Sequence, residues 1–216
     1  MYLIDSTYFI KDLIVPNKGV SLDIPNNEES LDQYIDKYAR QLLQNALGSV
    51  LFDELDSNIT NGILDPGADQ KWKDLVNGKS YTLSGTAYKW KGLLFTEGAF
   101  KGSILAQYTY YHWHLDQLSR MSRMGEVKGS AVNAQAVNST SKSVKVWNQY
   151  IEMYQGYQSQ GYTFSYVNGV PFHDYFNTNN SSDYVCLLEF LIHNETDYPD
   201  AAIRVEKDGF KNSMGL

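Results

Sequence analysis

Apolar side chains recur at helical spacing between residues 31 and 55, and one glycine, Gly48, interrupts the series. The segment "YIDKYARQLLQNALG" places tyrosine, isoleucine and leucine on one face, as expected for a helix that covers a core. Glycine inside a helix costs about 1 kcal/mol relative to alanine. We therefore predict two helices that meet at Gly48, which forms a corner in a compact domain and not a moving hinge.

The composition is that of a globular chain. The 216 residues are 43% hydrophobic and 20% charged, which suits one sizeable domain. The net charge of −7 argues against a dedicated nucleic-acid binder, which needs a basic surface, but allows a protein that encloses DNA without holding it. Cys186 lies in the run "YVCLLEFLI" and is predicted to be a small buried residue. No apolar run is long enough to span a membrane and the N-terminus lacks a secretory leader, so we expect folding in a cytoplasm.

Local patterns divide the chain into three parts: an extended arm at 1–25 with one or two strands, a helical domain at 26–193, and a tail at 194–216. Within the domain we predict hairpins near 80–94 and at 161–176, because Ser84-Gly85 and Asn168-Gly169 supply turns between alternating residues. Helices are predicted at 26–47, 49–59, 69–77, 103–123, 140–158 and from 182 or 183 to 193, with a loop at 124–139. The fold class is mainly α, a helical bundle with one or two small β-hairpins and extended termini.

Few residues suggest chemistry. His112 and His114 would share a face on a strand, but on a helix they diverge by about 200°, so we predict packing histidines and no metal site. His173-Asp174 has no nucleophile placed beside it, and Cys186 lies where a thiolate is disfavoured. No phosphate-binding loop, nucleotide fingerprint or catalytic motif is present. We therefore expect no enzyme activity and no cofactor.

Tyrosine is unusually frequent, with 17 residues in the chain. Its ring is apolar and its hydroxyl group needs a partner, so it suits half-buried surfaces such as subunit interfaces. Tyrosine and tryptophan also stack on sugars, which leaves a carbohydrate-binding module as an alternative. Such modules are usually β-sandwiches, whereas the strongest periodicities here are helical.

The order of these elements resembles that of the head–tail connector (adaptor, or head-completion) proteins of tailed bacteriophages, especially phages of Bacteroidetes and crAss-like phages. The similarity lies in "IDKYARQLLQNALGSVLFDEL", then "QKWKDLVNGKSYT" and "YKWKGLL", and then the tyrosine-rich "SILAQYTYYHWHL". It continues in "GEVKGSAVNAQ" and "VWNQYI", and loosely in the terminal "KNSMGL". It covers about residues 27 to 155 and the extreme C-terminus, and the hairpin at 161–176 departs from it.

This resemblance implies a structural virion protein at the head–tail junction: a subunit of a ring, commonly a dodecamer, that docks to the portal protein and meets further neck or tail proteins. Double-stranded DNA would pass through the lumen without sequence-specific binding, and no membrane would be involved. We expect the subunit interface to use five aromatic residues, although plain core packing also explains each: Tyr110, Trp113, Tyr162, Phe164 and Tyr166. The alternative function is a monomeric soluble binding module, for example for carbohydrate, with no connector role.

Overall fold

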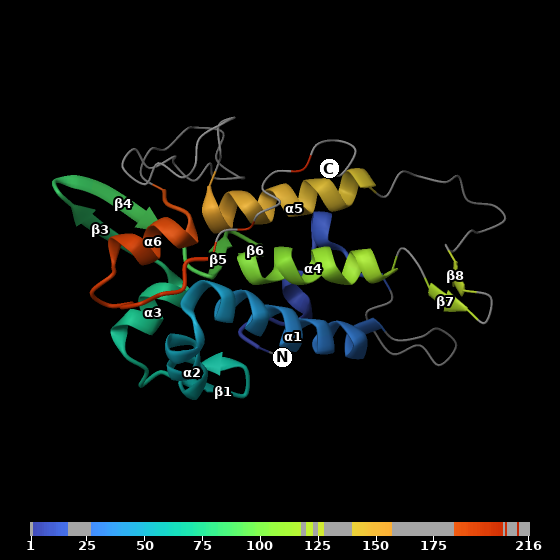
Figure 1. The fold of residues 1–216 in the computed structure, drawn as a ribbon, viewed down its shortest axis with the longest axis horizontal. Helices are drawn as coiled ribbons and strands as arrows, with labels where there is room; N and C mark the ends of the chain where they lie inside the picture. Colours follow the sequence, from blue (N-terminus) through green and yellow to red (C-terminus); the bar gives the residue numbers. More distant parts are fainter. Residues whose placement is uncertain are drawn as a thin grey trace.

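The structure is a computed structural model that describes residues 2–16, 27–117, 120–122, 125–127, 140–156, 184–204, 206 and 211. Over these residues the fold is mixed and mainly helical, with small antiparallel strand pairs (Figure 1). The helices are α1 (Asn27–Leu47), α2 (Ser49–Ser57), α3 (Gln70–Asn77), α4 (Ile104–Gln117), α5 (Thr140–Gln155) and α6 (Leu187–His193).

Helix α4 lies at the centre of the molecule, between α1 on one side and α5 on the other (Figure 1). Every residue of α4 from Ile104 to Tyr111 is buried, and so is Trp113. A helix with aromatic side chains all round must be covered all round, and α1, α5 and the N-terminal segment provide that cover. The helical spacing of α1 is confirmed, because Leu31, Ile35 and Leu42 are at most 1% exposed.

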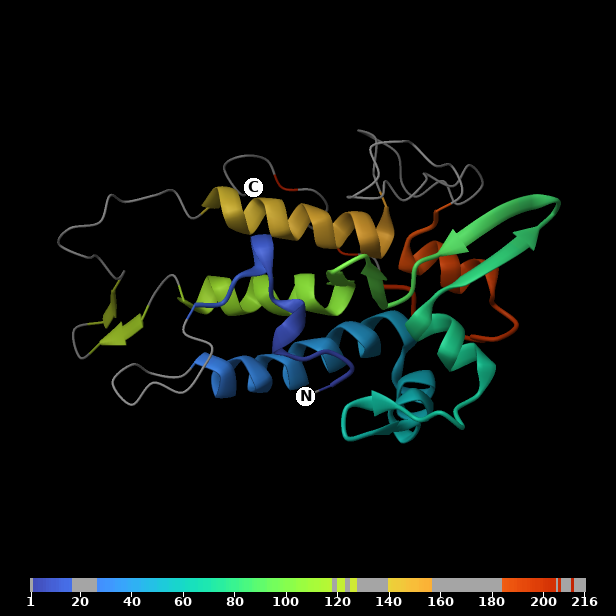
Figure 2. The same cartoon turned by 180° about the vertical axis from the view of Figure 1, so that it is seen from behind.

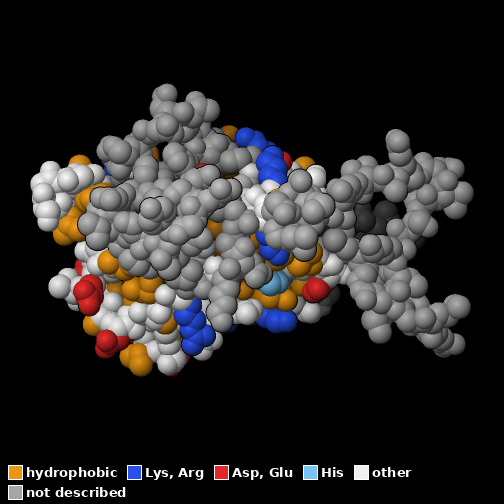
Figure 3. All heavy atoms as spheres, turned by 45° about the horizontal axis from the view of Figure 1, so that its top comes forward, with side chains coloured by type: hydrophobic (Ala, Val, Ile, Leu, Met, Phe, Trp, Pro, Cys, Tyr) orange, Lys and Arg blue, Asp and Glu red, His pale blue; other side chains and the backbone are white. Residues whose placement is uncertain are grey.

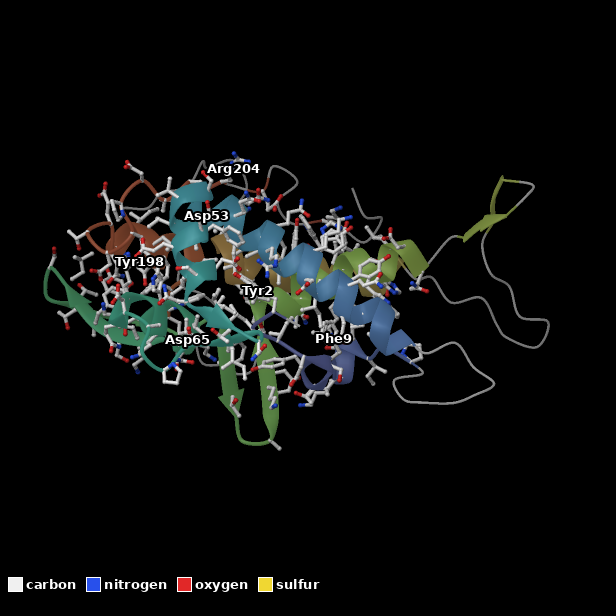
Figure 4. All side chains as sticks on the ribbon, turned by 90° about the horizontal axis from the view of Figure 1, so that it is seen from below. Tyr2, Phe9, Asp53, Asp65, Tyr198 and Arg204 are labelled. Atoms are coloured by element: carbon white, nitrogen blue, oxygen red, sulfur yellow. The ribbon has the colours of Figure 1, made fainter. Side chains whose placement is uncertain are left out.

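The N-terminal segment crosses the layer of α1, α4 and α5 on the side seen in Figure 2. We expected an extended arm with one or two strands here. The structure instead forms two 3-10 turns, η1 (Ser6–Tyr8) and η2 (Lys11–Leu13), and buries Tyr2 and Phe9 to 1% exposure. Figure 4 shows both aromatic side chains lying against the helices. The apolar residues that suggested strands are core residues of an irregular segment.

The predicted corner at Gly48 is confirmed. Gly48 separates α1 from α2 with a φ of 81°, a left-handed conformation that side chains rarely adopt. Its N–H still donates to the carbonyl oxygen of Gln44 at 2.9 Å, and its own carbonyl accepts from Phe52 at 3.0 Å. Both helices are therefore tied to the corner by backbone hydrogen bonds.

The predicted hairpin near 80–94 is confirmed as β3 (Lys79–Leu83) paired with β4 (Thr86–Trp90). Ser84 and Gly85 have φ values of 51° and 84°, the two positive angles that a tight hairpin turn requires. The sequence patterns missed three smaller strand pairs: β1 (Ile59–Thr60) with β2 (Ile63–Leu64), β5 (Leu94–Glu97) with β6 (Phe100–Ser103), and β7 (Arg120–Ser122) with β8 (Gly125–Val127).

Four predicted helix boundaries were wrong. Helix α2 ends at Ser57 and not at 59, because Ile59 belongs to strand β1, and α5 ends at Gln155, with Gly156 in a left-handed conformation that stops the helix. Helix α4 begins after Ser103 as expected, because the Ser103 hydroxyl oxygen accepts from the Leu105 N–H at 3.1 Å, but it ends at Gln117 and Arg120–Ser122 is strand β7. Helix α6 begins at Leu187 and not at 182 or 183, because the Val185 N–H donates to the Lys89 carbonyl and holds the chain extended. The predicted hairpin at 161–176 lies outside the described residues.

The described part of the predicted tail packs on the helices. Figure 4 shows Tyr198 between α6 and α3, where its hydroxyl group donates to the Lys71 carbonyl oxygen. Further on, the N–H and carbonyl oxygen of Glu206 bond the side-chain amide of Gln155, and those of Lys211 bond the amide of Asn148. Among the described helices, none is long and apolar enough to cross a membrane.

Candidate functional site

Half-buried aromatic rings form a strip along the surface between α1 and α4. The aromatic strip consists of Tyr34 and Tyr38, one turn apart on α1, and His112 of α4. The rings of Tyr34 and Tyr38 stack with centroids 5.7 Å apart, and Tyr38 stacks on His112 at 4.1 Å with ring planes only 2° apart. On one face of the molecule, Figure 3 shows hydrophobic side chains gathered around a histidine, with basic and acidic side chains beside them.

Charged groups lie at the margins of the aromatic strip. The Tyr34 hydroxyl group donates to the Asp116 carboxylate at 2.7 Å, and the Lys37 ammonium group lies 4.8 Å from the centre of the Tyr38 ring. Burial lowers the pKa of His112 to about 4, against the opposing pull of Asp116, so the ring is neutral at pH 7. Leu115, one turn from His112 on α4, is 37% exposed. An apolar centre with a charged margin is the usual composition of a protein–protein contact.

The structure places the predicted interface residues of α4 elsewhere. Tyr110 is 1% exposed and Trp113 is 3% exposed, so both side chains lie in the interior of this chain and the core-packing explanation fits them. The other three, Tyr162, Phe164 and Tyr166, lie outside the described residues. Sequence reasoning missed the strip because it assigned the α1 tyrosines to the apolar face. The sequence did contain a signal, because two successive turns of α1 carry tyrosine, which suits a partly exposed position, and not leucine.

The helix argument for the two histidines is confirmed. His112 stacks on Tyr38 of α1, whereas His114 points elsewhere and stacks on Tyr110, with ring centroids 5.7 Å apart. Both act as packing rings. In the described part of the chain, no three His, Cys, Asp or Glu side chains gather closely enough to hold a metal ion. The absence of a metal stays a prediction, and zinc analysis of the purified protein tests it.

A second cluster lies at the other end of the molecule, where α6 packs on the β3–β4 hairpin. The Tyr81 hydroxyl oxygen lies 2.9 Å from Nδ1 of His193, and Nε2 of His193 lies 3.8 Å from the Glu189 carboxyl group. The side chains of His193 and Glu189 are only 9% and 7% exposed. Burial raises the pKa of Glu189 to about 7, raises that of Tyr81 above its usual range and lowers that of His193.

This acid–base cluster has the groups of a proton relay, and its His193 and Glu189 side chains are almost fully buried. With His193 neutral, the Tyr81 hydroxyl group donates to Nδ1 when the ring proton is on Nε2, and it accepts from Nδ1 in the other tautomer. The nearby Cys186 is buried, as predicted, and burial raises the pKa of its thiol to about 12. We assign the cluster to the joint between α6 and the hairpin. Sequence reasoning missed it, although Glu189 and His193 stand four residues apart inside an apolar helix.

Comparisons with protein-family models, with curated proteins and with solved structures found no match. The class of protein therefore has to be inferred from the sequence and geometry of this chain.

Proposed function

We propose that this chain is a subunit of a head–tail connector ring of a tailed bacteriophage, docked to the portal protein and forming part of the DNA channel. In this proposal α1, α4 and α5 are the core of a connector-type helical bundle. The protein is structural, without catalysis or cofactor, and resides in the neck of the virion. Its partners are further copies of itself, commonly twelve, together with the portal and other neck or tail proteins.

The aromatic strip is the observation that carries the proposal. Stacked tyrosine and histidine rings that remain partly exposed are typical of surfaces that another protein covers, and Tyr is enriched at energetically important contacts. A ring also needs a second, different surface, because each subunit meets its two neighbours through unlike faces. The tip of the β3–β4 hairpin supplies one: residues 82–87 are exposed and project beyond the helices (Figure 1).

The net charge supports a role around DNA without binding to it. An excess of acidic over basic residues, 25 against 18, disfavours adhesion of the protein to a polyanion. DNA slides more easily through a channel whose wall attracts it only weakly. This support is secondary to that of the aromatic strip.

Assembly of purified protein tests the proposal. Native mass spectrometry and negative-stain imaging, with and without the portal protein, should show rings or portal-bound copies. The substitution Leu115→Glu places a charge at the edge of the aromatic strip and should shift the population to monomers. The matched control Ile63→Glu introduces the same charge on β2, at a residue that is 70% exposed, and should leave assembly unchanged.

The alternative, a monomeric binding module, predicts the opposite result. A chain that stays monomeric at all concentrations, and neither binds portal nor co-purifies with virions, would overturn the connector proposal. Equal loss of assembly in both variants would show that the aromatic strip is not the contact surface, because Leu115 and Ile63 lie on different elements.

A further inference from the structure

Three lysine side chains line a hollow between the β3–β4 hairpin, β5 and Tyr184. This lysine hollow is a shallow depression, open to solvent, with a volume of about 340 Å³. It is lined by Lys79, Lys89 and Lys91 and contains no aspartate or glutamate, although acidic residues outnumber basic ones in the chain. The local charge of the hollow is therefore opposite to that of the whole protein.

The three lysines differ in how much charge they offer. The Lys79 ammonium group lies 3.0 Å from the Asp74 carboxylate and 3.7 Å from that of Asp197, so these two groups offset its charge. Lys89 is exposed and makes no ion pair with a described residue; its ammonium nitrogen lies 5.7 Å from the centre of the Tyr184 ring. Lys91 lies 4.9 Å from the centre of the same ring. Both ammonium groups therefore lie within 6 Å of the Tyr184 ring, and that of Lys91 also lies 5.3 Å from the centre of the Phe95 ring.

Uncharged donors complete the lining. Ser80 and Thr96 contribute hydroxyl groups and Asn77 contributes an amide, and all three residues are exposed. Gly78 lets two parts of the lining approach closely, because a Cβ there would lie 2.6 Å from the Trp90 carbonyl oxygen. The hollow thus combines ammonium and hydroxyl donors, and the carboxylates of Asp74 and Asp197 beside it pair with Lys79.

We propose that the lysine hollow binds a phosphate group. Carboxylates are best recognised by the planar fork of arginine, which is absent from this lining, whereas lysine is a common phosphate ligand that acts as a point charge. A tetrahedral phosphate can accept from two ammonium groups and the flanking hydroxyl groups at once. Free phosphate, a mononucleotide and the DNA backbone share this chemistry. The proposal stands independently of the connector proposal, because it concerns a different surface and needs no ring.

Phosphate titration of the intact protein tests the site. Added inorganic phosphate should shift the amide NMR signals of Ser80 and Thr96 in a saturable way, whereas sodium chloride at equal ionic strength should not. The double variant Lys89→Gln/Lys91→Gln should weaken binding by roughly tenfold or more. The control Lys101→Gln/Lys142→Gln removes the same net charge at two residues outside the lining of the hollow and should bind as the wild type does.

The source of the phosphate is resolved by parallel titrations with inorganic phosphate, adenosine monophosphate and a short DNA duplex. Tightest binding by one of them, lost in the Lys89/Lys91 variant and kept in the control, supports the proposal and identifies the source. Absence of saturable shifts at Ser80 and Thr96 in the wild type overturns the phosphate proposal. This measurement uses the wild-type protein alone, so it does not depend on whether the variants fold. Equal weakening in both double variants also overturns it, since only the net charge would then matter.

Discussion

Glu189 carries a carboxyl group into the interior, where burial raises its pKa from 4.5 to about 7. Below pH 4.5 the group is protonated in the folded and the unfolded chain and does not affect stability. Between pH 4.5 and 7 the unfolded chain releases its proton first, so the free energy of unfolding falls as the pH rises. Above pH 7 the loss is complete, and it amounts to something on the order of 3 kcal/mol.

We therefore expect Glu189→Gln to remove this loss. The variant should gain stability relative to the wild type as the pH rises from 4.5 to 7, and the difference should then stay constant. Urea unfolding of both proteins at a series of pH values measures it. Glu195→Gln, which removes an exposed carboxyl group just beyond α6, is the matched control. A difference that does not change with pH would show that Glu189 is ionised in the folded protein at pH 5.

His112 acts in the opposite direction over an overlapping range of pH. Its pKa is lowered from 6.5 to about 4, so its contribution is fully present above pH 6.5 and is lost as the pH falls toward 4. We expect His112→Phe, which retains a ring to stack on Tyr38, to lose less stability than the wild type on acidification. Because the ring is partly exposed, the variant should lose at most about 2 kcal/mol less of its free energy of unfolding than the wild type does. An NMR titration of His112 with a midpoint near 6.5 would contradict this.

At the scale of elements, the end of α3 touches the chain that leads from β4 to β5. Gly92 has a φ of 96°, and a Cβ there would lie 2.6 Å from backbone atoms of Val76, Asn77 and Gly78. Backbone atoms cannot yield as a flexible side chain can, so this contact fixes how the β3–β4 hairpin sits on α3. The lysine hollow depends on the same contact, because Asn77 and Gly78 form part of its wall.

We expect Gly92→Ala to destabilise the protein by about 3 kcal/mol or more, because the two segments must separate. Gly85→Ala is the matched control: Gly85 also has a positive φ, 84°, but no atom lies within 4 Å of its Cβ position. It should cost only the backbone strain, about 1 to 2 kcal/mol. Equal losses in urea unfolding would mean that backbone strain, and not the close contact, accounts for both.

At the scale of the whole molecule, the C-terminal segment is tied along α5 by side-chain amides. Asn148 donates to the Lys211 carbonyl oxygen at 3.0 Å and accepts from its N–H at 2.8 Å, and Gln155 pairs in the same way with Glu206. The Tyr154 hydroxyl group adds a bond of 2.6 Å to the Arg204 carbonyl oxygen. Two side-chain amides, two helical turns apart on α5, thus bond backbone groups of the C-terminal segment that a neighbouring strand would otherwise pair.

The double variant Asn148→Ala/Gln155→Ala should release this segment. Each substitution should cost about 1 to 2 kcal/mol, because backbone groups of the segment lose their partners. Hydrogen exchange at Glu206 and Lys211 should accelerate in the variant, while Ser141→Ala, on the exposed side of α5, should change neither quantity. Unchanged exchange at Glu206 and Lys211 would show that other contacts hold the segment.

Local patterns predicted what depends on neighbours in the sequence. The apolar spacing of α1, the corner at Gly48 and the Ser84-Gly85 turn of the β3–β4 hairpin each follow from a few consecutive residues. Helix ends were less predictable where pairing with a distant strand competes with the helix. Tyr184 and Val185 are extended because they pair with Lys89, about a hundred residues earlier in the chain.

The sequence by itself determined that α4 must be covered, because aromatic side chains surround it, but not which elements cover which side. Only the tertiary structure buried Tyr110 and Trp113 and left Tyr34, Tyr38 and His112 partly exposed. The acid–base cluster and the lysine hollow likewise join side chains that are far apart in the chain. The physical reason is that helical spacing specifies an apolar face, whereas the partner of that face is chosen by packing across the whole molecule.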